Sequence, residues 1–324
     1  MLMAAGVGLA GGVRLAGEVR PVGMDAGRRV VPDDLGRSVS VVRTPLRIVS
    51  LSPGATEMLF SAGGGAQLVG TVQYSDEPPA ARTVPRIGDA VAIDMERLVA
   101  LRPDVVLVSP ALGNPAQLAK IRALGVPLYQ QQVMRLADLP ASVRRLGALT
   151  GTGPEAEREA RELQARLAAL EHDNSGRGMA GAAGAAGAAD TGGAARSRSG
   201  VRRPSVLLQV WNRPIYTIGG RHLMSDALSL CGARNVFADL PEPSPLVDIE
   251  AVIARDPDII LAAAPAGEAA AWVADWQRFP SLTAVRSGRV LEFEDQALSR
   301  MGPSVIDATE KLCRTIARLS RGSY

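Results

Sequence analysis

A phrase of 16 residues that occurs twice constrains the fold more than any other feature of this sequence. Residues 93–108 read IDMERLVALRPDVVLV, and residues 247–262 read VDIEAVIARDPDIILA. The two copies align without a gap at an offset of 154 positions (247 minus 93). The identical positions are Asp94/Asp248, Glu96/Glu250, Ala100/Ala254, Pro103/Pro257, Asp104/Asp258 and Leu107/Leu261. Two copies so far apart in the chain indicate two similar structural units.

The order of residue types in each copy predicts a short helix followed by a buried strand. The first Asp can cap the helix, because its carboxylate accepts a hydrogen bond from the open N–H groups of the first turn. The Glu two places later lies in that turn, where the helix dipole favours negative charge. The proline ends the helix, and the apolar runs 105–108 and 259–262 suit strands buried on both faces of a parallel sheet. We therefore expect an α/β fold with two similar lobes.

The composition argues against several classes of function. The net charge is only +3 and the Lys and Arg residues are scattered, so we expect no nucleic-acid partner. There are two histidines, His172 and His222, which disfavours a His-rich metal site or a Ser–His–Asp enzyme. Cys231 and Cys313 lack CxxC spacing, and are either buried thiols or one disulfide formed in an oxidising compartment. The sequence has no run of about 20 apolar residues, so we expect no membrane-spanning helix.

The chain divides into five predicted segments. Residues 1–29 lack the basic start and clear cleavage site of a good signal peptide, so they are either a weak export signal or a disordered start. Residues 30–153 form the first lobe, which opens with a predicted hairpin, and residues 204–324 form the second lobe. Residues 154–172 form a long polar helix that either links the lobes or packs on the first one. Residues 173–203 are a Gly- and Ala-rich insertion that we expect to be disordered.

One turn between a strand and a helix is a candidate ligand site. A predicted strand, 46–51, precedes Ser52-Pro53-Gly54 and an apolar helix. Ser52 is a natural N-cap and Pro53 a natural first helical residue. Open α/β sheets bind ligands at helix N-termini that follow parallel strands. The same residues also suit an ordinary structural turn.

Several motifs together resemble the periplasmic substrate-binding proteins in which a helical backbone links two lobes. They are RIVSLSPGATEMLFSAG, VGTVQYSDEPP, PRIGD, the two repeat copies, GGRHLMSDALSLCGARNVFADL and SRMGP. Their order covers about residues 44–172 and 204–320 and is most similar to the cobalamin (vitamin B12)-binding branch. The resemblance implies two lobes joined by a single long helix, a ligand cleft between the lobes, and no enzymatic activity. It also implies a periplasmic monomer that has no cofactor of its own and delivers cobalamin or a related corrinoid to an ABC transporter.

The resemblance further implies roles for individual residues. Ligand contacts are implied at Pro53, Gly54, Tyr74, Tyr216 and Arg300, and either Asp295 or Gln296 lies where an acidic contact is usual. Trp211 is added because it follows a predicted strand, and a flat corrin requires aromatic walls. Glu96 and Glu250 are implied to dock on the two subunits of a permease dimer, although simple helix capping explains them equally well. Cys231 and Cys313 are implied to form one disulfide.

The identity of the ligand stays open at this point. The sequence has Ala90 and Ser244 where the cobalamin-binding branch carries tryptophans, and both changes remove aromatic wall area from the cleft. Relatives bind heme or ferric siderophores, and Tyr74 or Tyr216 could serve as the axial ligand of a heme. A cytosolic enzyme acting on a tetrapyrrole is the alternative of another class. The sequence offers that enzyme neither a nucleophile–base pair nor a metal site.

Overall fold

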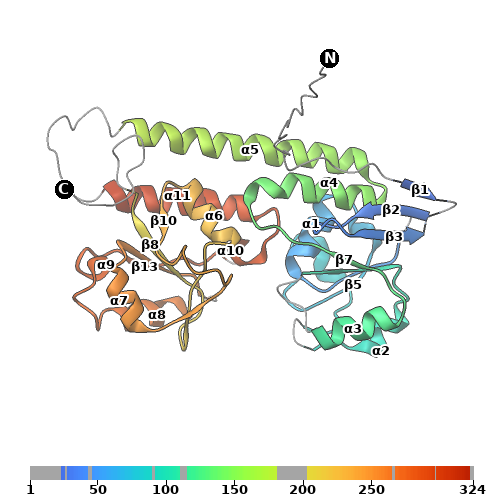
Figure 1. Ribbon diagram of the computed structural model, residues 1–324, viewed down its shortest axis with the longest axis horizontal. Helices are drawn as coiled ribbons and strands as arrows, with labels where there is room; N and C mark the ends of the chain where they lie inside the picture. The colour runs from blue at the N-terminus through green and yellow to red at the C-terminus, as the bar shows by residue number, and fades with distance from the viewer. Residues whose placement is uncertain are drawn as a thin grey trace, which may run out of the picture.

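Two parallel four-stranded sheets dominate the computed structural model (Figure 1). It describes residues 23–25, 28–42, 46–89, 92–109, 115–180, 203–264, 267–295 and 297–321. The first sheet has the order β5-β4-β6-β7 and the second the order β10-β8-β12-β13. The repeat supplies the third strand of each order, since β6 is Val105–Val108 and β12 is Ile259–Ala262. The predicted α/β fold with two similar lobes is therefore confirmed.

The first lobe alternates strands and helices along the chain. Its sheet strands are β4 (Ile48–Ser50), β5 (Leu68–Thr71), β6 and β7 (Leu128–Gln130). Its helices are α1 (Pro53–Ser61), α2 (Met95–Ala100), α3 (Pro115–Ala123) and α4 (Leu139–Thr150), with short 3-10 turns at Gly65–Gln67, Pro79–Thr83 and Leu136–Asp138. All four residues of β6 are buried, which explains why that strand is apolar on both faces.

The second lobe repeats this arrangement. Its sheet strands are β8 (Ser205–Gln209), β10 (Arg234–Asn235), β12 and β13 (Val290–Glu292), and β9 (Ile215–Tyr216) pairs separately with β11 (Leu246–Val247). Its helices are α6 (Leu223–Leu230), α7 (Ile249–Arg255), α8 (Ala269–Trp276), α9 (Thr283–Arg286), α10 (Ala297–Arg300) and α11 (Val305–Arg321). The helices α2 and α7 of the two repeat copies occupy equivalent places before β6 and β12.

A single long helix, α5 (Gly153–Ala180), runs along both lobes (Figure 1). Leu163, Leu167 and Leu170 are buried in a core that includes residues of both sheets. Arg166 of α5 forms ion pairs with Asp307 and Glu310 of α11, the latter at 2.9 Å. This helix therefore packs against the second lobe as well as the first, as a linking helix must.

The ends of α5 and of the N-terminal segment differ from the predicted boundaries. The linking helix continues eight residues past His172, so the insertion predicted at 173–203 begins inside it (180 minus 172). This extension contains Gly176 and Gly178, which have poor helix propensity, and Asn174 Nδ2 donates to Leu170 O of the same helix at 2.9 Å. Residues 181–202 lie outside the described residues. Strand β1 (Gly23–Asp25) pairs with β2 (Arg28–Pro32), so residues predicted to belong to an export signal or a disordered start extend the hairpin β2–β3 (Ser38–Val42).

A disulfide joins Cys231 to Cys313, as the resemblance implied. Cys231 is the C-cap residue of α6, and Cys313 lies on α11, 82 positions later. The bond ties α6 to α11, and Cys313 Sγ accepts from Asn174 Nδ2 of α5 at 3.5 Å. Within the described part of the chain, no helix is long and apolar enough to cross a membrane.

Candidate functional site

The turn at Pro53 and Gly54 lies where the two lobes touch. Ser52 is the N-cap of α1, and Pro53 is its first residue, as predicted. A Cβ atom added at Gly54 would lie 1.9 Å from the carbonyl oxygen of Arg300, the last residue of α10 in the second lobe. Only a glycine permits this approach of two backbones. Two predicted ligand residues from opposite lobes, Gly54 and Arg300, are therefore in direct contact.

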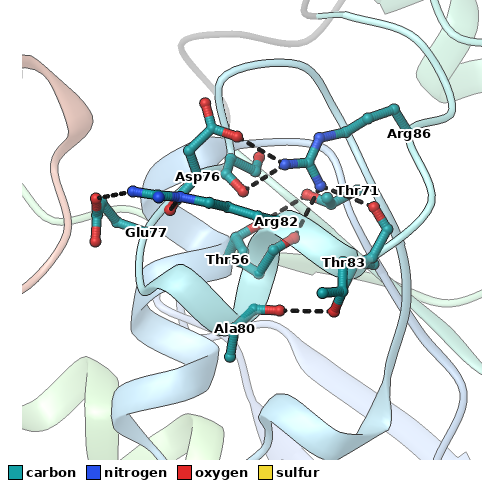
Figure 2. A network of polar contacts seen from close by, with 11 residues as sticks. Thr56, Thr71, Asp76, Glu77, Ala80, Arg82, Thr83 and Arg86 are labelled. Atoms are coloured by element: carbon teal, nitrogen blue, oxygen red, sulfur yellow. Dashed lines mark hydrogen bonds and ion pairs between the residues drawn. The ribbon is translucent and has the colours of Figure 1, made fainter.

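Tyr74 lies on an ordered loop that follows β5. Its side chain is 76% exposed and its φ of 66° is left-handed, which is uncommon for a residue with a Cβ. Figure 2 shows how Arg86 closes the loop, donating to Asp76 and to backbone oxygens of the same loop. Arg82 pairs with Glu77 at 3.2 Å. The loop thus presents an aromatic ring to solvent on a rigid base.

Trp211 and Tyr216 form a second aromatic group, on the other lobe. They follow β8 and form an isolated antiparallel bridge, with Tyr216 N donating to Trp211 O at 3.1 Å. Trp211 is 49% exposed and stands edge-on to Trp272, with ring centroids 6.2 Å apart. Trp272 is buried, so the exposed indole rests on a fixed ring. An exposed Trp on such a base is suited to contact a large flat ligand.

The predicted acidic contact lies between β13 and α10. Asp295 pairs with Lys311 of α11 at 3.6 Å, and one of its carboxylate oxygens accepts from Ala297 N. Gln296, the alternative contact, lies outside the described residues. Asp295 therefore shapes the start of α10, the helix that ends at Arg300, in addition to any contact with a ligand.

Sequence reasoning missed Glu57, a buried carboxylate of α1. Its side chain is 7% exposed, and it accepts hydrogen bonds from Ser304 N and from Ser304 Oγ (2.9 Å) at the start of α11 in the opposite lobe. Burial raises the pKa of Glu57, with the hydrogen bonds from Ser304 and the charge of Arg300 acting in the opposite direction. The available signal was weak, because a Glu near the start of a helix is ordinarily a solvated residue.

The repeat residues Glu96 and Glu250 occupy matching exposed positions on α2 and α7. Asp94 and Asp248 are the N-caps of these helices, so neither glutamate is needed as the cap. One turn later, Val99 and Ile253 are 50% and 40% exposed, again at equivalent positions. Each lobe therefore presents one carboxylate and one exposed aliphatic side chain on the same helix face. Figure 1 shows α2 and α7 at the ends of the lobes away from α5.

The remaining buried charges have structural partners. Asp34 of the hairpin turn accepts from Ser142 Oγ at 2.6 Å and pairs with Arg145 Nη1 at 2.9 Å, which fastens the hairpin to α4. Burial raises the pKa of Asp34, opposed by Ser142 and Arg145. Among the residues that the structure describes, no group of three His, Cys, Asp or Glu side chains is placed to hold a metal ion.

Comparison with known proteins gives a consistent assignment. A family model described as periplasmic binding protein matches residues 48–297. The chain is 32% identical to the vitamin B12-binding protein of Pectobacterium carotovorum subsp. carotovorum (strain PC1) over 280 residues, which cover 86% of this chain and 91% of that protein.

Solved structures agree with this likeness. The periplasmic vitamin B12 binding protein of Vibrio cholerae superimposes with a TM-score of 0.71 at 28% identity, covering 86% of this chain and 99% of that one. A periplasmic heme-binding protein of Roseiflexus sp. RS-1 gives 0.67 at 26% identity, covering 86% and 100%. The family comprises transport proteins that bind a substrate. This assignment excludes the alternative that the chain is a cytosolic enzyme acting on a tetrapyrrole. Because the family model matches residues 48–297 and a solved structure shares the two-lobe architecture, the chain belongs to the periplasmic binding protein family.

Proposed function

We propose that this protein captures cobalamin or a related corrinoid between its two lobes and delivers it to an ABC importer. The observation that carries the proposal is the 32% identity to a vitamin B12-binding protein over 86% of the chain. The placement of the aromatic residues supports it. Tyr74 on one lobe and Trp211 on the other are exposed rings on rigid bases, which suit the two faces of a flat macrocycle.

Within this proposal the ligand contacts are divided between the lobes. Pro53, Gly54 and Tyr74 belong to the first lobe, and Trp211, Tyr216, Asp295 and Arg300 to the second. Arg300 and Asp295 supply charge-bearing groups that can recognise the amide side chains of a corrin. In this proposal the floor of the site is the junction of the lobes, and the close approach of Gly54 to the carbonyl oxygen of Arg300 supports it.

Titration with candidate ligands tests the proposal. Purified protein is mixed with cobalamin, cobinamide, hemin and a ferric siderophore, and binding is followed by tryptophan fluorescence and ligand absorbance. We expect cobalamin to quench the fluorescence of wild-type protein and to quench that of Trp211→Phe less. Trp276→Phe is the matched control, because Trp276 is buried and its ring packs against Phe279. If cobalamin and cobinamide both fail at high micromolar concentration while hemin binds, the corrinoid proposal is wrong.

Heme is the second candidate ligand. The likeness to a heme-binding structure with a TM-score of 0.67 favours it, as does the exposed phenol of Tyr74, which could ligate iron. A hemin spectrum that changes in Tyr74→Phe, together with no cobalamin binding, would support this alternative.

Delivery requires a surface that meets the transporter, and we place it on Glu96 and Glu250. Each lies beside an exposed aliphatic side chain, Val99 or Ile253, at repeat-equivalent positions. A two-fold symmetric permease dimer could meet each glutamate with one basic residue from each subunit. Charges on the rim of an interface govern association and its salt dependence more than folding.

A pair of double variants tests the docking surface. We expect Glu96→Ala with Glu250→Ala to keep ligand affinity and to lose ligand-driven ATP turnover by the transporter in proteoliposomes. The matched control is Glu162→Ala with Glu171→Ala, which removes the same charge from exposed positions on α5, on the other side of the molecule. Equal stimulation by the two double variants at physiological salt would show that the glutamates do not dock.

We also propose a periplasmic location and a monomeric state. The match to the vitamin B12-binding protein covers 91% of that relative's length, and the family is described as periplasmic. Cell fractionation with N-terminal sequencing of the mature chain tests the location, and light scattering after size-exclusion chromatography tests the monomer.

A further inference from the structure

The junction between the lobes contains a buried carboxylate that the proposed binding role does not use. Glu57 is the fifth residue of α1, the helix of the first lobe that begins at the Pro53–Gly54 turn. Its two oxygens accept from the backbone N–H and the hydroxyl of Ser304, which is 247 positions away in the sequence. Residue Ser304 immediately precedes α11, and its carbonyl oxygen accepts from Ala308 N at 3.2 Å, as expected for the N-cap of that helix.

The contact has the geometry of a helix cap supplied by another lobe. A carboxylate at a helix N-terminus satisfies an open N–H group and interacts favourably with the helix dipole. The segment that reaches this cap is fitted closely around it, because a Cβ atom added at Gly302 would lie 2.6 Å from Glu57 Oε2. The same segment contains Arg300, whose carbonyl oxygen approaches Gly54. Segment 300–304 therefore meets α1 at two points, through Gly54 and through Glu57.

The first lobe holds Glu57 firmly in place. The neighbouring residue Thr56 shares a 2.8 Å hydrogen bond with Thr71 of β5, which anchors the start of α1 on its sheet (Figure 2). The charged groups that act on Glu57 come from two other elements: Arg300 at the end of α10 and Glu77 on the Tyr74 loop, where Glu77 itself pairs with Arg82. The carboxylate thus stands between the segments that carry two of the proposed ligand contacts, Tyr74 and Arg300.

We propose that Glu57 is a positioning residue that latches the second lobe to the first, and that it sets the place of Arg300 relative to the Pro53–Gly54 turn. The latch restricts opening and closing of the lobes at the floor of the site, in addition to the restraint from α5, which packs against both lobes. Its consequence for ligand binding rests on the proposed function, whereas its consequence for the distance between the lobes does not.

Two readouts test the latch in the full chain. For the first, cysteines introduced by Ala119→Cys on α3 and Ser287→Cys after α9 carry spin labels on exposed positions of opposite lobes. Pulsed electron resonance then measures the distribution of distances between the lobes without ligand. We expect Glu57→Ala to broaden this distribution. We expect Glu57→Gln, which can still accept from Ser304 N, to stay close to wild type.

The second readout is affinity for cobalamin. We expect Glu57→Ala to weaken binding about tenfold, the order expected when a charge-assisted hydrogen bond is lost, and Glu57→Gln to recover most of it. Ser304→Ala, which removes only the hydroxyl donated to Glu57, should weaken binding about threefold. The matched control is Ser142→Ala, which removes a hydroxyl donated to the buried carboxylate of Asp34 within the first lobe. It should change neither distance nor affinity.

The outcomes separate the latch from the proposed function. A distance distribution in Glu57→Ala that matches wild type overturns the latch, as does equal broadening in Ser142→Ala. A broadened distribution with unchanged cobalamin affinity overturns the positioning of Arg300. If Glu57→Ala fails to fold, the comparison of Ser304→Ala with Ser142→Ala decides in the same way. If wild type does not bind cobalamin while Glu57→Ala broadens the distances, the proposed ligand is wrong and the latch is supported.

Discussion

His222 makes the stability of the second lobe dependent on pH. It is the N-cap residue of α6, and its Nδ1 accepts from Met224 N at 3.1 Å. The ring is buried, and this burial lowers the pKa of His222 from 6.5 to about 4. A protonated ring could not accept from Met224 N, so protonation removes the cap as well as burying a charge.

The sign and size of the effect follow from the two pKa values. In the folded protein the imidazole resists protonation until about pH 4, whereas in the unfolded chain it takes up a proton near pH 6.5. Between these values the unfolded state binds more protons, so stability falls as the pH falls through this window. Titration of His222 should therefore lower the free energy of unfolding by about 2.5 kcal/mol when the pH falls from 7.5 to 4.5, since each pKa unit is worth about 1.4 kcal/mol.

Urea unfolding of wild type and of His222→Asn at pH 7.5 and pH 4.5 measures this contribution. Asn is a good N-cap that does not titrate here, so the variant should keep the helix start and lose the pH dependence of this one site. The carboxylates common to both proteins cancel in the comparison. We expect the difference in unfolding free energy between the two proteins to change by about 2–3 kcal/mol between the two pH values. A change below about 1 kcal/mol would show that His222 is not held neutral by burial.

Three further perturbations have definite expected outcomes. The Cys231–Cys313 bond closes a loop of 82 positions, so its reduction should lower the unfolding free energy by at most about 4–5 kcal/mol. Two free thiols titrated in unreduced, unfolded protein would contradict the disulfide. Gly54→Ala should cost about 1–3 kcal/mol and weaken ligand binding, because the added Cβ meets the carbonyl of Arg300; an unchanged melting temperature and affinity would disprove that close approach. Asp34→Ala should cost about 1–3 kcal/mol in urea unfolding, because Ser142 Oγ and Gln132 N lose their acceptor and the partly exposed Arg145 loses its partner; a loss below about 0.5 kcal/mol would mean that the hairpin does not depend on Asp34.

Much of the architecture could be predicted from local patterns. The Asp caps at 94 and 248, the proline stops and the two apolar runs specify helix and strand within each copy, and the structure has them at those residues. The order of motifs was also enough to indicate the family and the pairing of the cysteines. The predicted boundary between the linking helix and the insertion differs from the structure, because α5 continues through Asp173 to Ala180 although Gly176 and Gly178 have poor helix propensity.

The sequence alone determined the kinds of elements, their order and their duplication, since capping, proline stops and apolar periodicity act over a few neighbouring residues. Only the tertiary structure decided which residues of the two lobes meet. Glu57 and Ser304 are 247 positions apart, and nothing near either residue predicts a hydrogen bond between them. The contact between Gly54 and Arg300 likewise depends on how α5 and α11 set one lobe against the other. Such contacts depend on packing over the whole chain, which is why the latch at the floor of the site is absent from any local pattern.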